Sequence, residues 1–402
     1  MEALLLLEDG TLFQGRSFTG PGEAFGELVF NTGLTGYQEV ISDPSYAGQI
    51  VLLTAPMIGT YGIRLREEES ARVWTEGLVV REYGGRPLGE AAAEASSRRA
   101  AGEPAGRQPV FGRPAYDPQA AREDALAQNS PVTGSLADCL AGSGVLGVEG
   151  VDTRALTRHI RDKGAMRCGL TTETTDPRAF LLRVRASPSM LGRSLVREVS
   201  TAEPYLYADG PGPRIAVLDC GVKARSLHEL ARRGCRVEVF PAYTGARELL
   251  RSRPQGLLLS NGPGDPATLP EIVAVASELL ERLPVFGICL GHQLLAQALG
   301  ARTFKLPFGH HGANHPVREE ASGRVFITTQ NHGFAVDPDS LPAGDAEATL
   351  LNLNDRTNEG LRHRRLPALG VQFHPEAAPG PHDTLFLFDA FLALAREARP
   401  RA

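Results

Sequence analysis

The sequence predicts an α/β protein in two parts, a β-rich N-terminal domain followed by a C-terminal domain whose mostly parallel sheet is flanked by helices. The C-terminal prediction depends on residues 214–300, where short apolar segments alternate with segments of helical spacing. The N-terminal prediction depends on residues 3–54, where apolar segments are separated by Gly, Asp and Pro. The length of 402 residues agrees with two or three domains.

Residues 1–200 are expected to form the first domain, and they begin with a pattern typical of antiparallel strands. Residues 3–8 are apolar, Asp9-Gly10 is a hairpin turn signal, and the segment T-L-F-Q-G-R follows as the returning strand. Two further strands are predicted at 27–31 and 49–54. The segment between these two strands is dense in Gly, Thr, Ser, Asp and Pro, and we interpret it as a loop.

Two later segments of this half differ from the strand pattern. Residues 84–131 are rich in Ala, Gly, Arg, Pro and Glu and show no sustained period, so they predict a mobile insertion that buries little apolar surface. Residues 151–163 predict a helix, because Asp152 or Thr153 is a suitable N-cap and Gly164 a suitable end. The Arg and His side chains of this helix are most simply a solvated face.

The second domain is expected at residues 214–402, after a linker of Gly, Pro and Asp at 201–213. Its first part repeats the order strand, helix, strand, which implies a parallel sheet with helices on both faces. Sheets of this kind form their sites at the carboxyl ends of the strands. Because Gly262, Pro263 and Gly264 directly follow a predicted strand, we expect a site there.

Residues 284–300 predict the feature around which this domain is organised. The segment P-V-F-G-I-C-L-G-H-Q-L-L-A-Q-A-L-G is typical of a strand, a sharp turn and a helix, with Cys289 at the turn. Gly287 and Gly291 flank the cysteine as glycines flank the nucleophile of a nucleophile elbow. A helix N-terminus directed at the sulfur favours the thiolate, which is the attacking species. The alternative is a cysteine that only packs.

A base for Cys289 is predicted downstream. The segment P-A-L-G-V-Q-F-H-P-E at 367–376 has a strand pattern that ends in His374 and Glu376, two residues apart and therefore on one face of an extended segment. Glu376 would orient the His374 ring while the ring accepts the thiol proton of Cys289. The three side chains together predict nucleophilic catalysis.

Composition argues against several other classes of function. The chain is 42% hydrophobic and 22% charged, its formal net charge is -5, and it has no long basic run, so neither nucleic acid nor an anionic membrane surface is expected as a partner. No stretch reaches the roughly 18 apolar residues of a membrane helix, and the N-terminus lacks the basic start of a signal peptide. The five cysteines have no framework spacing, which predicts reduced thiols and a cytoplasmic location.

Several segments resemble class I glutamine amidotransferases. The motifs G-I-C-L-G-H-Q and F-H-P-E are similar to the signature of that family, as are S-N-G-P-G-D-P at 260–266, F-G-H-H-G-A-N-H-P at 308–316 and Q-N-H-G-F-A-V at 330–336. The segments F-N-T-G-L-T-G-Y-Q-E at 30–39 and D-P-S-Y-A-G-Q-I-V at 43–51 resemble the leading domain of one branch of the family. That branch comprises the small, glutamine-hydrolysing subunits of carbamoyl-phosphate synthase.

The resemblance implies that L-glutamine is hydrolysed to glutamate and ammonia through a thioester on Cys289. The geometry of an elbow places the N–H of Leu290 at the tetrahedral oxyanion, and the resemblance adds the N–H of Gly262. Within the family, the loop between the second pair of strands supplies a serine from the neighbouring domain, and the Q-N-H-G-F segment is interpreted as a substrate loop. The glutamine-binding residues implied in this way are Ser45, Gly262, Gly264, Leu290, Gln293, Asn331, Gly333 and Phe334.

The resemblance also implies a large synthetase subunit as partner, which would make carbamoyl phosphate from the ammonia, bicarbonate and ATP for arginine and pyrimidine biosynthesis. The chain has no G-x-x-x-x-G-K-S/T motif, so ATP and Mg²⁺ are expected on the partner, and no cofactor is expected in this chain. No metal site is predicted either, because the neighbouring histidines lack an accompanying set of cysteines or carboxylates. These histidines, which we expect to shape the cleft and the partner-facing surface, are His310, His311, His315 and His332.

Two other functions stay open on the sequence alone. A free-standing γ-glutamyl hydrolase could use the same three catalytic residues, but it would leave the N-terminal domain without a role. A non-catalytic regulatory subunit could keep the fold without turnover, but Cys289, His374 and Glu376 are all intact.

Overall fold

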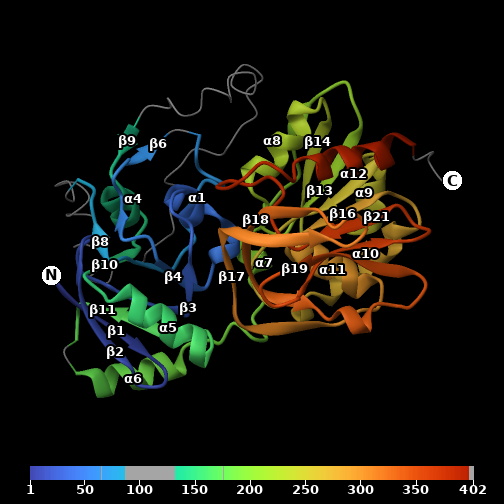
Figure 1. The fold of residues 1–402 in the computed structure, drawn as a ribbon. Coiled ribbons are helices and arrows are strands. Elements are labelled where there is room, and N and C mark those ends of the chain that lie inside the picture. Colours follow the sequence, from blue (N-terminus) through green and yellow to red (C-terminus); the bar gives the residue numbers. More distant parts are fainter. Residues whose placement is uncertain (65, 87–131, 175, 398–402) are drawn as a thin grey trace. The chain divides into compact units, whose positions relative to one another are not determined.

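A computed structural model describes residues 1–64, 66–86, 132–174 and 176–397 (Figure 1). The chain divides into two compact units. The N-terminal unit contains the described residues up to Arg193 together with Pro307–His311, and the C-terminal unit contains the rest from Ser194. Most of the predicted insertion, residues 87–131, lies outside the described residues.

A closed barrel forms the N-terminal unit, with strand order β1-β11-β3-β4-β7-β10-β2. The predicted hairpin is confirmed, because β1 and β2 pair antiparallel with Leu5 opposite Phe13. The barrel strands are β1 (Glu2–Leu7), β2 (Leu12–Ser17), β3 (Glu23–Asn31), β4 (Gln49–Leu53), β7 (Gly77–Val79), β10 (Leu146–Glu149) and β11 (Met166–Thr171). Two short pairs accompany them, β5 (Met57–Ile58) with β8 (Glu82–Tyr83) and β6 (Ile63–Arg64) with β9 (Val132–Gly134).

Helix α5 (Thr153–Lys163) of this unit has the ends that the sequence predicts. The carboxylate of Asp152 accepts the N–H of Ala155 at 2.9 Å, and Gly164 ends the helix with φ 97°. Leu156 and Ile160 are fully buried against the barrel. The other helices of the unit are α1 (Tyr37–Ser42), η1 (Pro44–Tyr46), α4 (Leu136–Gly142) and α6 (Pro177–Ala186).

The segment between β3 and β4 is not the loop that its composition predicts, because it contains α1 and η1. Tyr37, Val40 and Ile41 are buried at helical spacing. Three apolar positions within six residues are too few to stand out against the surrounding turn residues, so tertiary burial determines this helix.

A 10-stranded sheet forms the C-terminal unit, in the order β12-β14-β13-β15-β16-β21-β20-β19-β17-β18. The strands from β14 to β21 in this order are parallel, which confirms the predicted alternation of strands and helices. The strands are β12 (Tyr205–Asp209), β13 (Arg214–Asp219), β14 (Arg236–Pro241), β15 (Gly256–Leu259), β16 (Val285–Ile288), β17 (Thr303–Glu319), β18 (Val325–Val336), β19 (Ala346–Asn352), β20 (Asn358–His363) and β21 (Ala368–Val371).

Half of this sheet departs from the predicted parallel arrangement. Strands β20, β19 and β17 extend it with antiparallel pairs. No α-helix occurs between residues 303 and 363, all of which the structure describes. Parallel neighbours need a long crossover, so strands joined without one pair antiparallel.

Helices cover both faces of the parallel part of the sheet (Figure 1). Along β13, Ala216 and Leu218 join one apolar cluster while Ile215 and Val217 join the other, because successive side chains of a strand point to opposite faces. Helices α9 (Ala246–Arg251), α10 (Pro270–Leu280) and α11 (Leu290–Ala298) supply the first cluster, and α8 (Ala224–Arg232) and α12 (Phe386–Glu397) the second. Short helices α7 (Val196–Val199), η3 (Pro266–Thr268) and η4 (Pro338–Ser340) complete the unit.

Residues 201–213 are more than the predicted linker, since they contain β12. Tyr205 lies opposite Val239 of β14, and the strand forms an antiparallel edge of the sheet. Gly212 then donates its N–H to the carbonyl of Gly234 at 2.7 Å. The Gly and Pro residues that end this strand led the sequence interpretation to a linker. Among the described residues, no helix is both long and apolar enough to cross a membrane.

Candidate active site

Cys289 lies at the predicted turn between β16 and α11, at the carboxyl end of a parallel strand. Its backbone has φ 53° and ψ -106°, a conformation that costs a non-glycine residue about 1–3 kcal/mol. Two hydrogen bonds hold it there: its N–H donates to the carbonyl of Val371 at 2.9 Å, and its carbonyl accepts the N–H of Gln293 at 3.1 Å. The strand on one side and the helix on the other therefore fix the direction of the sulfur.

The two glycines that flank Cys289 allow close packing and do not themselves carry the unusual φ. A Cβ at Gly287 would lie 2.5 Å from the carbonyl oxygen of Gly291, and a Cβ at Gly291 would lie 2.0 Å from that of Leu259. Neither distance is compatible with a side chain. Helix α11 therefore lies directly against β15 and β16, and the strain of the elbow falls on the cysteine.

His374 and Glu376 are in contact, but they do not lie on an extended strand as predicted. Strand β21 ends at Val371, and a turn follows in which Ala377 donates its N–H to the carbonyl of His374 at 3.1 Å. Pro375 has no N–H with which to continue the strand ladder. The turn nevertheless brings His374 Nδ1 to 2.7 Å from Glu376 Oε1.

The charges of this buried pair support each other. Burial by itself lowers the pKa of His374, but the Glu376 carboxylate and the neighbouring Cys289 raise it well above its ordinary value. Burial would raise the pKa of Glu376, but His374 and Lys223 hold it well below its ordinary value. Each of the two side chains therefore favours the charged form of the other.

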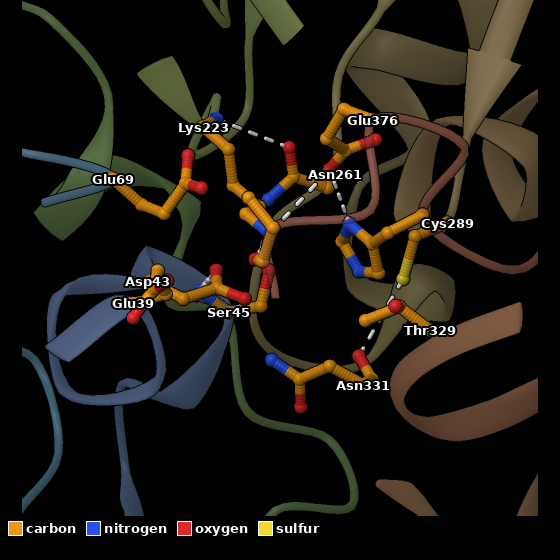
Figure 2. A network of polar contacts seen from close by, with 12 residues as sticks. Glu39, Asp43, Ser45, Glu69, Lys223, Asn261, Cys289, Thr329, Asn331 and Glu376 are labelled. Atoms are coloured by element: carbon orange, nitrogen blue, oxygen red, sulfur yellow. Dashed lines mark hydrogen bonds and ion pairs between the residues drawn. The ribbon is translucent and has the colours of Figure 1, made fainter. Parts of the chain in front are cut away.

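Lys223 is a member of this site that the sequence interpretation missed (Figure 2). Its side chain is 2% exposed, donates to the carbonyl of Ala378 at 2.6 Å and lies 3.6 Å from Glu376 Oε1. A lysine four residues past the end of β13, at the edge of the sheet where sites form, was the available signal. A buried ammonium here balances the charge of the carboxylate.

The second ring nitrogen of His374, Nε2, has no hydrogen-bond partner among the residues that the structure describes. Cys289 is near enough to influence the pKa of the ring. The thiol of Cys289 donates instead to the carbonyl of Asn331 at 3.6 Å (Figure 2). Nε2 is therefore the ring nitrogen of His374 that remains for proton exchange with a neighbouring group.

Gly262 and Leu290 lie side by side at the elbow. A Cβ at Gly262 would come 2.0 Å from the carbonyl oxygen of Cys220 and 3.0 Å from the Cδ2 atom of Leu290, so no side chain fits. Leu290 is the first residue of α11, and its N–H has no partner within the helix. The side chain of Asn261 fixes the approach to Gly262 by donating to the carbonyl of Gly221 at 2.8 Å. The N–H of Leu290 therefore lies at the start of α11, with the main chain of Gly262 packed beside this residue.

Asn331, Gly333 and Phe334 lie on strand β18, and the predicted loop in this segment is wrong. The carbonyl of Phe334 accepts a hydrogen bond from Nε2 of Gln293 at 2.8 Å, so β18 contacts helix α11 one turn after Cys289. Gly264, with φ 94°, forms an isolated bridge with Ser194. These residues therefore line the same end of the sheet as Cys289.

Ser45 belongs to the N-terminal unit, where it lies in η1 and is buried. Its N–H donates to the carboxylate of Asp43 at 2.8 Å, the cap that holds this short helix. The role that the resemblance gives to Ser45 in binding glutamine stays a prediction.

Gln372 was also missed. Its side-chain nitrogen lies 3.7 Å from Cys289 Sγ, and its side-chain oxygen accepts from Gln293 at 3.1 Å. Its place two residues before His374, in the same apolar segment, was the signal that could have found it.

Family models match both halves of the chain. The model described as "Glutamine amidotransferase class-I" matches residues 216–394. The model described as "Carbamoyl-phosphate synthase small chain, CPSase domain" matches residues 5–98 and 121–170.

Full-length relatives carry the name "Carbamoyl phosphate synthase small chain". The relative from Symbiobacterium thermophilum is 47% identical over 394 residues, which cover 96% of this chain and 97% of the relative. The relative from Nitratidesulfovibrio vulgaris is 44% identical over 414 residues, covering 99% of each, and that from Synechococcus sp. is 46% identical over 412 residues, covering 99% of this chain and 94% of the relative. The chain therefore belongs to the carbamoyl phosphate synthase small chain family, with a class I glutamine amidotransferase domain in its C-terminal half.

Proposed function

We propose that this chain hydrolyses L-glutamine to glutamate and ammonia through a covalent thioester on Cys289. The observation that carries the proposal is the position of Cys289 at a strained elbow beside the His374 and Glu376 pair, whose joined atoms are 2.7 Å apart. A nucleophile, a base and a residue that orients the base are the groups that cleavage of an unreactive carboxamide requires.

The first half of the reaction forms the thioester. His374 accepts the thiol proton, and the sulfur attacks the γ-carboxamide carbon of glutamine. The carbonyl oxygen becomes an oxyanion, to which Leu290 and Gly262 donate their main-chain N–H groups. Each donor of this kind stabilises the transition state by about 3 to 4 kcal/mol. The carbon–nitrogen bond then breaks, and the proton on His374 goes to the departing nitrogen as ammonia leaves.

The second half releases glutamate. His374 takes a proton from a water molecule, whose oxygen attacks the thioester carbon. The same two N–H groups hold the second oxyanion. The carbon–sulfur bond breaks, glutamate leaves, and the proton returns from His374 to the sulfur.

The ammonia passes to a large synthetase subunit, which binds ATP and Mg²⁺ and makes carbamoyl phosphate from bicarbonate. The name "small chain" in the relatives supports a larger partner chain. The match of residues 5–98 and 121–170 to a small-chain domain supports the same assignment, because a free-standing hydrolase has no need of it.

The test is ammonia release from glutamine by the purified chain, alone and with the large subunit of a relative plus ATP and bicarbonate. We expect slow release alone and strong stimulation by the complete mixture. Full activity alone on larger γ-glutamyl compounds, without any response to the partner, would instead support a free-standing hydrolase. Absence of ammonia release in both mixtures, from a folded chain, would support a non-catalytic subunit.

A further inference from the structure

Gln372 is a fully buried glutamine beside the nucleophile, and the catalytic steps above do not use it. It follows directly on β21, and its main-chain N–H donates to the carbonyl of Glu359 at 2.9 Å. Its side-chain Nε2 lies 3.7 Å from Cys289 Sγ, while its Oε1 accepts from Gln293 Nε2 at 3.1 Å. Both ends of the carboxamide are therefore engaged inside the protein.

The hydrogen-bond network decides which end of Gln372 faces the sulfur. The carbonyl of Phe334 can only accept, so Gln293 must present its NH₂ group to it, at 2.8 Å. A ring nitrogen of His332 lies 2.7 Å from the same carbonyl. Because that NH₂ group of Gln293 also reaches Gln372, Gln372 must offer its oxygen there. The NH₂ group of Gln372 is then directed at Cys289.

We propose that Gln372 is a hydrogen-bond donor to Cys289 Sγ that stabilises the thiolate over the thiol. A donor gains most when the acceptor is charged. The sulfur carries that charge before it attacks and again when the thioester breaks. The carbonyl of Asn331, 3.6 Å from Sγ, has the opposite preference because it accepts the S–H of the resting thiol. Gln372 thus favours the thiolate of Cys289, and the carbonyl of Asn331 favours the thiol.

The effect on the thiol is independent of any reaction with glutamine, and only its kinetic consequence rests on the proposed function. It is measured as the pH dependence of alkylation of Cys289 by iodoacetamide, which reports the thiolate fraction. The remaining cysteines are buried, and burial raises the pKa of each of their thiols, so their reaction is slow. The Cys289→Ala variant gives the background rate.

Gln372→Met removes the donor with little change in volume. We expect its alkylation at neutral pH to be about tenfold slower than that of the wild type, the usual size of one hydrogen bond to a charged group. The rate profile should move to higher pH. The titratable groups His374, Glu376 and Lys223, and His332 and Glu359 next to the Gln372 network, are all unchanged in the variant. Glutamine hydrolysis should lose kcat with little change in KM.

Gln297→Met is the matched control, since Gln297 lies on the same helix as Gln293 but donates to Thr303 Oγ1 at 3.0 Å. It should keep the wild-type profile. If Gln372→Met does not fold, Gln372→Leu provides the second variant, because it also removes the donor and adds no charge beside the sulfur. We expect the same shift of the profile for Gln372→Leu as for Gln372→Met.

A folded Gln372 variant with the wild-type alkylation profile would overturn the proposal. A shifted profile in a protein whose wild type releases no ammonia would support the proposal and refute the proposed function. Normal glutaminase activity in the wild type, with an unshifted alkylation profile in the Gln372 variant, would support the proposed function and refute the role of Gln372 as a donor.

Discussion

Cys168 in the barrel and Cys289 at the elbow are both buried cysteines, 0% and 2% exposed, but their surroundings differ. Cys168 lies on β11, paired with neighbours on both sides, and packs in an apolar cluster that includes Leu5 and Leu28. Burial raises the pKa of its thiol. Cys289 instead contacts the carbonyl of Asn331 and the amide of Gln372.

The difference between these two regions teaches that burial alone does not determine the chemistry of a cysteine. In the barrel, the regular strand places the thiol in an apolar cluster, where it contacts the carbonyl of the neighbouring Gly169 at 3.7 Å. At the elbow, the strained backbone places the sulfur beside the carbonyl of Asn331 and the amide of Gln372. We therefore expect the same residue type to be inert in the barrel and, under the proposed function, a nucleophile at the elbow.

The largest expected effect is on glutamine hydrolysis, when Cys289 and Cys168 are each replaced by alanine. Cys289→Ala should lower glutamine hydrolysis by on the order of a thousandfold or more, because no other group supplies the covalent step. Cys168→Ala should keep the activity and cost only about 1 kcal/mol of stability. Ammonia release and urea unfolding of both variants provide the measurement. Equal activities in the two variants would show that Cys289 is not the nucleophile.

The ion pair at His374 is the second point of difference from the barrel. Glu376→Gln should lower kcat by roughly 100-fold to 10000-fold, since the ring loses its orientation and its charge partner. It should also cost about 3 to 5 kcal/mol of unfolding free energy, because the buried His374 ring and the ammonium of Lys223 lose the carboxylate that they both contact. The matched change in the barrel is Glu8→Gln. Glu8 pairs with Arg167 at 2.6 Å, with both side chains 29% exposed, and the expected cost is below about 1 kcal/mol.

The pH dependence of this cost follows from the directions of the two pKa shifts. Glu376 has a lowered pKa, so its contribution is present above its ordinary value of 4.5 and is lost as the pH falls through the lowered value. His374 has a raised pKa, so its contribution is present below its ordinary value of 6.5 and is lost as the pH rises through the raised value. Both contributions are fully present between pH 4.5 and pH 6.5, so the stability difference between wild type and Glu376→Gln should be greatest in that range. A difference that does not vary with pH would argue against the ion pair.

The third test compares two glycines that differ in the space available for an added Cβ atom. Gly291→Ala places a Cβ 2.0 Å from the carbonyl oxygen of Leu259, and should destabilise the C-terminal unit by about 1 to 3 kcal/mol while displacing the elbow. Gly142→Ala is the control at the end of α4, where no atom lies within 4 Å of the added Cβ. It should leave stability unchanged or raise it by about 0.5 to 1 kcal/mol. Thermal unfolding with ammonia release would reveal the contrast, and a tolerated Gly291→Ala would show that α11 can move away from β15.

The local sequence pattern was sufficient to predict those helices and strands that have one dominant sequence signal. The alternation around β13 and β15 and the glycines beside Cys289 have such signals, and the structure has the elements that they predict. Helix α1 and strand β12 lack them, since each has only five or six residues among turn formers. Their conformations are determined by burial against distant parts of the chain.

The same limit applies within the candidate site. Cys289 and the contact of His374 with Glu376 were predicted, because they lie in segments with a recognisable spacing. Lys223 and Gln372 were not, because neither residue type indicates burial and their contacts join segments that are far apart in sequence. Pro375 shows the opposite case, in which a predicted contact is formed by a turn and not by the predicted strand.

The starts of two helices give the smallest expected effect and sharpen the comparison further. In the barrel, α5 begins at an aspartate whose carboxylate accepts the N–H of Ala155, an arrangement that stabilises the helix. In the C-terminal unit, α11 begins at Cys289, which makes no capping hydrogen bond with its side chain. The start of α5 satisfies one of its N–H groups with a capping side chain, whereas the start of α11 leaves its N–H groups for the proposed oxyanion.

Asp152→Ala should therefore destabilise α5 by about 1 kcal/mol without changing ammonia release. Asp152→Asn is the control, because an asparagine caps nearly as well and should restore most of the loss. Hydrogen exchange of the amides in the first turn of α5 gives the local measurement, and faster exchange is expected only in the alanine variant. If the alanine variant also lost catalysis, the first helix start would have a function beyond capping, and the contrast with α11 would fail.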